Sequence, residues 1–234
     1  MESLSLNNDY FVVCANELIK ASQKMTLQEM KLIQIAIAQI KKDDEQLNTY
    51  VTIASDLAKF LNTDVRNIYR DYDNITDKLM GNIIKIQDED RIKKFQWVSY
   101  CEYNRDTQEI KIRLHDELKP YLMGLNQLYT QITLEEIVSF NSYYALRLYQ
   151  LLVCEYGISK RTHYELTDSE VRFFFGVEDF KYARNKDLFK KTIAAAIDEI
   201  NLKEYCTIYN YTINHDLRKK GRPAVSVSFD VKGL

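Results

Sequence analysis

Hydrophobic positions recur every three to four residues in several stretches, as expected for helices with one buried face. The clearest stretch is residues 180–203, FKYARNKDLFKKTIAAAIDEINLK. Its apolar face holds Phe189, Ile193, Ala196, Ile197 and Ile200. The opposite face holds Asp187, Lys191, Ala194, Ala195 and Asp198, with Lys190 at its margin. Because two of these residues are alanines, a partner can approach the helix backbone closely on this side.

Basic and amide side chains lie ahead of the first turn of this predicted helix, namely Lys181, Arg184, Asn185 and Lys186. The free N–H groups at a helix start already favour anions. A helix with a small outer face and a basic entrance suits insertion into a DNA major groove beside phosphates. An ordinary surface helix with solvated lysines explains the same stretch equally well, so the rest of the chain must decide.

The first part of the chain predicts short strands and helices. Residues 10–22 indicate a short strand and a short helix, and T-L-Q-E at residues 26–29 is a capping box that opens a helix to about Ile40. This helix, MKLIQIAIAQI, is apolar on almost every side. We expect it to be buried on two sides, by its own domain or by a second subunit. A strand is predicted at Thr49–Ile53.

A helix-turn-helix and a hairpin follow. The helix-turn-helix consists of the short helix ASDLAKFLN, a break at residues 62–63 and a longer helix over residues 64–82. The longer helix directs Arg66, Asn67 and Arg70 outward. Two strand-like runs, IKKFQWVSYCEY and EIKIRL, are joined by residues 104–108. This order is the plan of a winged helix.

The second part of the chain repeats the same order. Capping boxes at residues 133–136 and 167–170 open two helices, the first of which we expect to end at Gly157. The strand THYEL lies between them, and the helix over residues 180–203 follows. Two strands, YCTIYNYTI and AVSVSFDV, flank a loop that contains RKKGRP. We therefore predict an α+β fold of tandem winged-helix domains, over residues 1–124 and 133–234, with a linker at residues 125–132.

Composition is that of a folded globular chain, with 46% hydrophobic and 28% charged residues. No apolar run reaches the roughly 18 residues that span a bilayer, and the N-terminus lacks the features of a signal peptide, so we expect a cytoplasmic protein without a membrane partner. The net charge of −2 does not indicate a nucleic-acid binder. Residues 159–234, however, hold 14 Lys+Arg and 11 Asp+Glu, and their basic residues are clustered.

Catalytic and metal-binding patterns are missing from the sequence. The four cysteines and three histidines are scattered, which predicts buried free thiols and no metal site. A rolling-circle nickase would need a tyrosine beside a metal held by clustered histidines or acids, and no His-x-His occurs. No phosphate-binding loop of an ATPase occurs either. We expect neither a cofactor nor enzymatic activity.

Several segments resemble iteron-binding plasmid replication initiators: YYALRLYQLL, the KRT that follows this helix, DLFKKTIAAAIDEIN and KKGRPAVSVSF. The resemblance spans nearly the whole chain and is most specific from Phe140 onward. It implies that the second winged helix reads direct repeats in double-stranded DNA at a plasmid origin. It also implies a homodimer formed through the first domain, which adds DNA contacts. In this family dimers repress their own promoter, while monomers engage the origin and the host initiator and helicase machinery.

The expected DNA-binding residues fall into three groups in the second domain and one in the first. The recognition helix supplies Arg184, Asn185, Lys186, Lys190, Lys191 and Ala194. The wing supplies Arg218, Lys219, Lys220 and Arg222, and the KRT segment supplies Lys160 and Arg161. Secondary contacts fall to Arg66, Asn67 and Arg70. Members of the family often carry Pro where this chain has Ala195, so the bend of the helix can differ.

Two other readings share the winged-helix fold. A transcription regulator would use the same DNA-binding chemistry, and only the resemblance separates it from an initiator. A protein-interaction module that touches no DNA fits the first domain, because Asp73 and Asp77 lie on the outer face of its long helix. It fits the second domain less well, since basic residues occur both at the helix entrance and in the wing.

Overall fold

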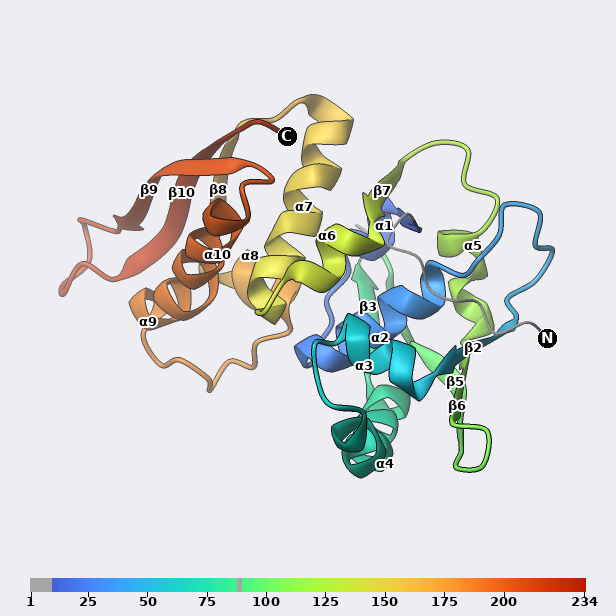
Figure 1. Ribbon diagram of the computed structural model, residues 1–234. Helices are drawn as coiled ribbons and strands as arrows, with labels where there is room; N and C mark the ends of the chain where they lie inside the picture. The colour runs from blue at the N-terminus through green and yellow to red at the C-terminus, as the bar shows by residue number, and fades with distance from the viewer. Residues whose placement is uncertain (1–9, 88–89) are drawn as a thin grey trace. The chain divides into compact units, whose positions relative to one another are not determined.

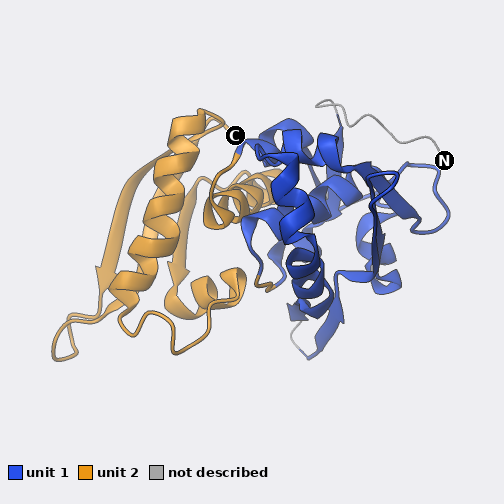
Figure 2. Cartoon of the chain, turned by 60° about the horizontal axis from the view of Figure 1, so that its bottom comes forward, with its two compact units in different colours: residues 1–21, 25–139 blue, residues 22–24, 140–234 orange. Residues whose placement is uncertain are grey.

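The computed structural model describes residues 10–87 and 90–234 (Figure 1). These residues form two compact units, which are coloured separately in Figure 2. Unit 1 comprises the described residues up to Ala21 together with Met25–Ser139, and unit 2 comprises Ser22–Lys24 and Phe140–Leu234. Within the described ranges, no helix is long and apolar enough to cross a membrane.

Unit 1 begins with the strand β1 and contains both helices and short strands. Its helices are α1 (Asn16–Lys20), α2 (Leu27–Ile37), α3 (Ala54–Phe60), α4 (Val65–Gly81), the 3-10 turn η1 (Asp116–Leu118), α5 (Lys119–Leu122) and α6 (Leu134–Ser139). Its strands are β1 (Phe11–Ala15), β2 (Thr49–Ile53), β3 (Ile83–Gln87), β4 (Ile92–Gln96), β5 (Val98–Asn104), β6 (Glu109–Leu114) and β7 (Tyr129–Thr133).

The winged helix of unit 1 consists of α3, α4 and the antiparallel sheet β2-β6-β5. Asp64 starts α4 by accepting a hydrogen bond from the backbone N–H of Arg66. The inward face of α4 holds Ile68, Tyr72 and Leu79, all of them buried, as the 3.6-residue period predicted. The predicted helix-turn-helix and hairpin are therefore confirmed in this unit.

Helix α2 is buried by its own unit, which corrects one reason for expecting a second subunit. It starts at the predicted capping box of Thr26 and Glu29, and all residues from 30 to 39 are buried. It contacts α4, α6 and β1. Its polar side chains also find partners within the unit, since Lys31 Nζ donates to the carbonyl of Val138 at 2.7 Å. The apolar surface of α2 is therefore no argument for a dimer.

Strands β3 and β7 were not predicted, and β7 changes the predicted boundary. The run IKKFQWVSYCEY divides at Trp97 into β4, which pairs with β3, and β5, which pairs with β6. Strand β7 lies largely within the expected linker at residues 125–132, yet it pairs along its whole length with β1. Asn16 fixes this pairing, because its N–H donates to the Leu128 carbonyl at 2.8 Å and its side chain accepts from Thr130 Oγ1 at 2.7 Å. The two units divide at residues 139 and 140 instead.

Unit 2 repeats the winged-helix plan with a longer lead helix. Its helices are α7 (Tyr143–Ser159), α8 (Asp168–Phe175), α9 (Asn185–Phe189), the π-helical turn η2 (Lys190–Ala194) and α10 (Ala195–Lys203). Its strands are β8 (His163–Thr167), β9 (Thr207–His215) and β10 (Ala224–Lys232), in the order β8-β10-β9. This order corresponds strand for strand to β2-β6-β5 of unit 1. The prediction of an α+β fold with two winged helices is confirmed.

The core of unit 2 lies between the helices and one face of the sheet. Phe189, Ile193 and Ile200 are fully buried, as the apolar stripe predicted. From the sheet, Val227 and Phe229 of β10 complete this core. The helix predicted to run from the capping box at residues 133–136 to Gly157 was wrong in two respects. Residues 140–142 separate α6 from α7, and α7 continues to Ser159, where Lys160 adopts the left-handed conformation that ends it, at φ 54°.

Candidate nucleic-acid interface

The recognition helix begins at Asn185, within the basic segment that was expected to precede its first turn. Residues 180–184 are not helical, and Arg184 is the N-cap residue of α9 with no side-chain cap. The Asp187 N–H donates to the Arg184 carbonyl at 2.9 Å, whereas the N–H groups of Asn185 and Lys186 can turn to an anion. Asp187 lies in the same turn and accepts a hydrogen bond from Arg184 Nε at 2.9 Å, with 83% of the Arg184 side chain exposed. An exposed pair of this kind is weak, so Arg184 can exchange it for a phosphate.

A π-helical turn interrupts this helix at its middle. It spans Lys190–Ala194 and is followed directly by α10, which starts at Ala195. Thr192 is fully buried there and donates its hydroxyl to the Leu188 carbonyl at 2.8 Å. Such turns widen a helix locally and are frequent at functional sites. They do not follow from hydrophobic period, so the sequence reading did not detect this one.

The outer face of the helix has the composition that the sequence predicted. Lys190, Lys191 and Ala195 are exposed, and Ala194 is half-buried. Neither lysine has a carboxylate partner in the part of the chain that the structure describes. The face therefore presents two lysines without direct carboxylate partners beside two alanines, although Asp198 is exposed on the same face.

The wing loop, residues 216–223, is closed by its own backbone. Asp216 N–H donates to the Pro223 carbonyl at 2.9 Å, and Arg222 N–H donates to the Lys219 carbonyl at 3.0 Å. Asp216 also accepts from the backbone N–H of Arg218 at 3.0 Å. These bonds hold the backbone in a turn from which the basic side chains extend. All four predicted wing residues, Arg218, Lys219, Lys220 and Arg222, are exposed.

One hydrogen bond joins the two basic segments. Asn185, the first residue of α9, donates its side-chain amide to the Ala224 carbonyl at 3.1 Å, and Ala224 begins β10 directly after the wing loop. The structure thus brings the helix entrance and the wing together. It gives Asn185 a structural role, in addition to the DNA contact that was predicted for it.

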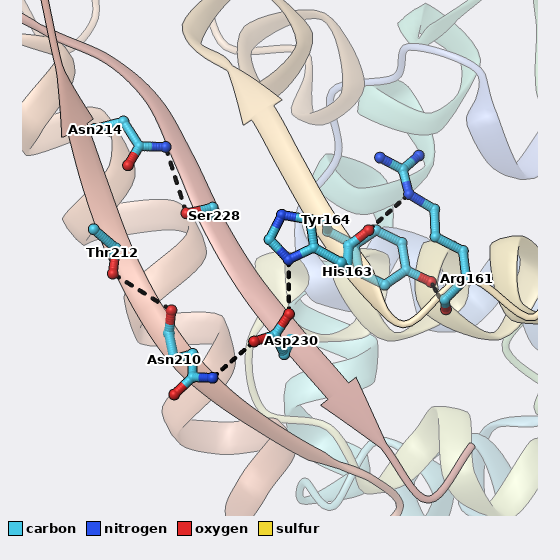
Figure 3. Close-up of polar contacts among 8 residues, drawn as sticks. All are labelled: Arg161, His163, Tyr164, Asn210, Thr212, Asn214, Ser228 and Asp230. Carbon is cyan, nitrogen blue, oxygen red and sulfur yellow. Dashed lines mark hydrogen bonds and ion pairs between the residues drawn. The ribbon is translucent and has the colours of Figure 1, made fainter.

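The KRT segment lies at the other end of the sheet. His163 pairs with Asp230 at the far end of β10, whereas the wing loop precedes Ala224 at the near end. Arg161 Nε donates to the His163 carbonyl at 2.8 Å, and its guanidinium lies 5.0 Å from the centre of the Tyr164 ring (Figure 3). Lys160 lies over the Tyr156 ring at 4.4 Å. The structure therefore does not place Lys160 and Arg161 with the helix and wing residues.

The outward face of the sheet carries a network of polar side chains (Figure 3). Asp230 accepts from Asn210 Nδ2 at 2.8 Å and lies 2.7 Å from His163 Nδ1, and these contacts hold the pKa of Asp230 below its usual value. Glu165 accepts from Ser226 Oγ at 2.6 Å on the same face. Two carboxylates make this face unfavourable for DNA phosphates, which points to the helix and wing as the binding side.

The two arginines of the equivalent helix of unit 1 are paired with neighbouring carboxylates. Arg66 donates to both carboxylate oxygens of Asp64, at 3.0 and 2.9 Å, and holds the pKa of Asp64 at about 2. Arg70 pairs with Asp71 at 2.7 and 2.9 Å. The third predicted secondary residue, Asn67, donates to Thr63 Oγ1 at 3.1 Å. These three residues are not gathered into a basic surface like that of unit 2.

Two residues outside the predicted set shape the entrance of the recognition helix. Arg172 of α8 donates to three backbone carbonyls of the loop before α9. Gly176 ends α8 at φ +61°, where an added Cβ would lie 2.5 Å from the Gln23 carbonyl oxygen. A glycine directly after an apolar helical run is a sequence signal for such a helix end. The contacts of Arg172 depend on the loop conformation and have no sequence signal.

Comparison with known proteins matches both halves of the chain. The family model described as Initiator Replication protein, WH1, matches residues 11–153, and the model described as Initiator Rep protein, WH2, matches residues 169–231. A replication initiation protein from Escherichia coli is 26% identical over 234 residues, covering 96% of this chain and 70% of the relative. The fold resembles that in the crystal structure of Pi initiator protein in complex with iteron DNA. The TM-score is 0.74 at 18% identity, over 97% of this chain and 98% of that one.

These findings confirm the family that the sequence motifs indicated. The WH1 match alone spans more than half of the chain. The WH2 match covers the segment that contains the recognition helix and the wing. This chain belongs to the initiator replication protein family, with its WH1 and WH2 winged-helix domains in that order.

Proposed function

We propose that this protein binds direct repeats in double-stranded DNA at a plasmid origin and thereby initiates replication. The single observation that carries the proposal is the bond between Asn185 and Ala224, which places the entrance of the recognition helix beside the basic wing. A winged helix meets DNA through these two segments. The Pi initiator, which has a similar fold, was crystallised with iteron DNA.

Each part of the interface has a distinct role in this proposal. The α9–η2–α10 helix enters the major groove, where Ala194 and Ala195 allow close approach to base edges. Lys186, Lys190 and Lys191 contact the phosphates that flank the groove. The wing lysines, Lys219 and Lys220, contact the backbone farther along the duplex. The residues of the helix position the protein on the duplex and read its bases. The wing lysines mainly add affinity.

Unit 1 has a supporting role in the proposal. Because α4 carries as many acidic residues as basic ones, this helix attracts phosphate less than the helix of unit 2 does. It adds secondary contacts, or it serves as a protein surface for a second copy of the chain or for the host initiator and helicase machinery. Self-association with repression of its own promoter remains part of the proposal. Sedimentation of the full chain, with and without repeat DNA, tests this self-association. A chain that stays monomeric at every concentration would contradict it.

The proposed activity is non-enzymatic and cytoplasmic, and it requires no cofactor. Among the described residues, no group of three or more His, Cys, Asp or Glu side chains is placed to hold a metal ion. A transcription regulator remains the alternative, because the interface itself would be the same. An origin plasmid that replicates only when the intact protein is supplied would distinguish an initiator from a regulator.

The direct test is competition between a duplex with the direct repeats and a shuffled duplex of equal length. We expect the repeat duplex to bind about 10³-fold more tightly at moderate salt, because base contacts add to a modest electrostatic attraction. Fluorescence anisotropy with unlabelled competitor measures this ratio. Equal affinity for the two duplexes would contradict the proposal.

A further inference from the structure

The loop between α8 and α9, residues 176–184, leads into the recognition helix and has no regular secondary structure of its own. It carries Lys181 and Arg184, both exposed, and Arg184 directly precedes the first helical turn. A loop of this length would ordinarily sample many conformations. The direction of its two basic side chains therefore depends on what holds its backbone.

One side chain holds it at three points. Arg172 Nη1 donates to the carbonyls of Glu178 and Lys181, at 3.1 and 2.8 Å. Its Nη2 donates to the carbonyl of Tyr182 at 2.9 Å. Tyr182 is in the left-handed conformation, at φ +59°, which a non-glycine residue adopts only when its surroundings impose it. The guanidinium of Arg172 is therefore bonded to the strained part of the loop.

Other contacts close the loop against the same unit. Lys181 N–H donates to the Glu178 carbonyl at 3.0 Å, which makes a turn around the exposed residues between them. The Glu178 carboxylate pairs with Lys24 Nζ at 2.9 Å, and both residues belong to unit 2. Val177 is buried directly after the helix end. The side chain of Arg172 adds its three hydrogen bonds to carbonyls of this loop.

Only arginine has the donor geometry for this arrangement. Its guanidinium presents five N–H donors in a fixed plane, so two nitrogens can serve three acceptors at once. A lysine carries the same charge on a single nitrogen at the end of a flexible chain and cannot span the same carbonyls. Arg172→Lys therefore removes the geometry and keeps the charge.

We propose that Arg172 is a positioning residue for DNA binding: it fixes the α8–α9 loop so that Lys181 and Arg184 meet phosphates at the entrance of the recognition helix. The proposal rests on the DNA-binding function proposed above. Arg172 itself touches no phosphate. Without its three bonds the loop must be ordered at the moment of binding, and that cost lowers affinity.

The test is a double-mutant cycle in the full chain. The variants are Arg172→Lys, the pair Lys181→Ala with Arg184→Ala, and all three changes together. We expect Arg172→Lys to weaken binding to the repeat duplex by roughly 10-fold, and the alanine pair by a similar factor. The triple variant should bind only slightly more weakly than the alanine pair, because the loop then has no basic side chains left to position. If the loss of affinity in the triple variant equals the product of the two separate losses, the proposal is wrong.

Two further readouts separate positioning from general stability. The log–log salt slope should become shallower in Arg172→Lys, although its net charge is unchanged, because Lys181 and Arg184 no longer meet their phosphates. Hydrogen exchange of residues 177–184 should accelerate in the free protein. An unchanged slope together with unchanged exchange would contradict the inference. If Arg172→Lys does not fold at the assay temperature, Arg172→Gln replaces it in the same cycle.

Controls distinguish this inference from the proposed function. Arg113→Lys, in β6 of unit 1, changes an exposed arginine that donates to Thr49 Oγ1 at 3.2 Å, and it should leave binding unaltered. If the unmodified chain fails to prefer the repeat duplex, the proposed function is wrong. If it prefers the repeats and the cycle is additive, the function stands and the role of Arg172 is wrong.

Discussion

At the scale of single residues, the two winged-helix domains differ in how many basic side chains have a neighbouring carboxylate partner. Arg66 and Arg70 each lie against a carboxylate one or two positions away, and in unit 2 Arg184 and Lys219 are paired in a similar way with Asp187 and Asp216. In unit 2, Lys190, Lys191 and Lys220 form no salt bridge with any residue that the structure describes. The same residue types at equivalent places in a fold can therefore have different consequences, depending on the acids beside them.

Substitution of Gly176 tests the backbone conformation at the end of α8. Gly176→Ala should lower the free energy of unfolding by roughly 2–4 kcal/mol, because a Cβ at φ +61° adds strain and also meets the Gln23 backbone. Gly221→Ala is the matched control in the same unit, since its φ is +81° and nothing lies within 4 Å of the added Cβ. It should cost about 1 kcal/mol. Equal decreases in the free energy of unfolding, measured with denaturant, would refute the contact at Gly176.

The network around Asp230 predicts a dependence of stability on pH. Since His163 and Asn210 lower the pKa of Asp230 below its ordinary value of 3.8, the carboxylate stabilises the folded state above that pH. This contribution disappears as the pH falls through the lowered pKa. The wild type should therefore melt above Asp230→Asn at about pH 5, and the difference should shrink towards about pH 3. Asp43→Asn, at an exposed position of unit 1, is the control and should show a smaller difference.

At the scale of the elements, features set by residues close in sequence were predicted correctly, whereas strand pairings between distant residues were not predicted. The three predicted capping boxes, at Thr26, Thr133 and Thr167, each start a helix, because the bonds involved join residues three positions apart. The β1–β7 pairing joins residues more than 100 positions apart, and the sequence of neither strand indicates which strand it pairs with. The π-helical turn and the Arg172 contacts likewise depend on packing that the sequence pattern does not specify.

The wing is the element whose charge is expected to act without sequence preference. Changing both Lys219 and Lys220 to Ala should weaken repeat and shuffled duplexes by the same factor. The log–log salt slope should become shallower by roughly 1 to 2 units, because each lysine neutralises about one phosphate. The matched control is Lys41→Ala with Lys42→Ala, an exposed lysine pair between α2 and β2. A weakening confined to the repeat duplex would mean that the wing reads bases.

At the scale of the whole molecule, the tandem architecture followed from the repeated order of elements along the chain. Both units have the strand order of a winged helix, although unit 1 contains the additional β3–β4 hairpin. The boundary did not follow, because a stretch without strong periodicity was interpreted as a linker and is instead the β7 edge of unit 1. The DNA-binding surface was predicted for unit 2, where the structure brings the helix entrance and the wing together. The KRT segment was included in this surface only because of the family resemblance.

The affinity of Ala195→Glu for the repeat duplex tests most directly whether this helix reads DNA. Thr207→Glu is the control, because Thr207 is exposed in the same unit and pairs with Lys232, at the end of the sheet away from the wing. We expect Ala195→Glu to bind at least about 100-fold more weakly, since it sets bulk and negative charge against the groove, while Thr207→Glu stays within about threefold. Unaltered binding by a folded Ala195→Glu protein would show that the helix does not enter the groove.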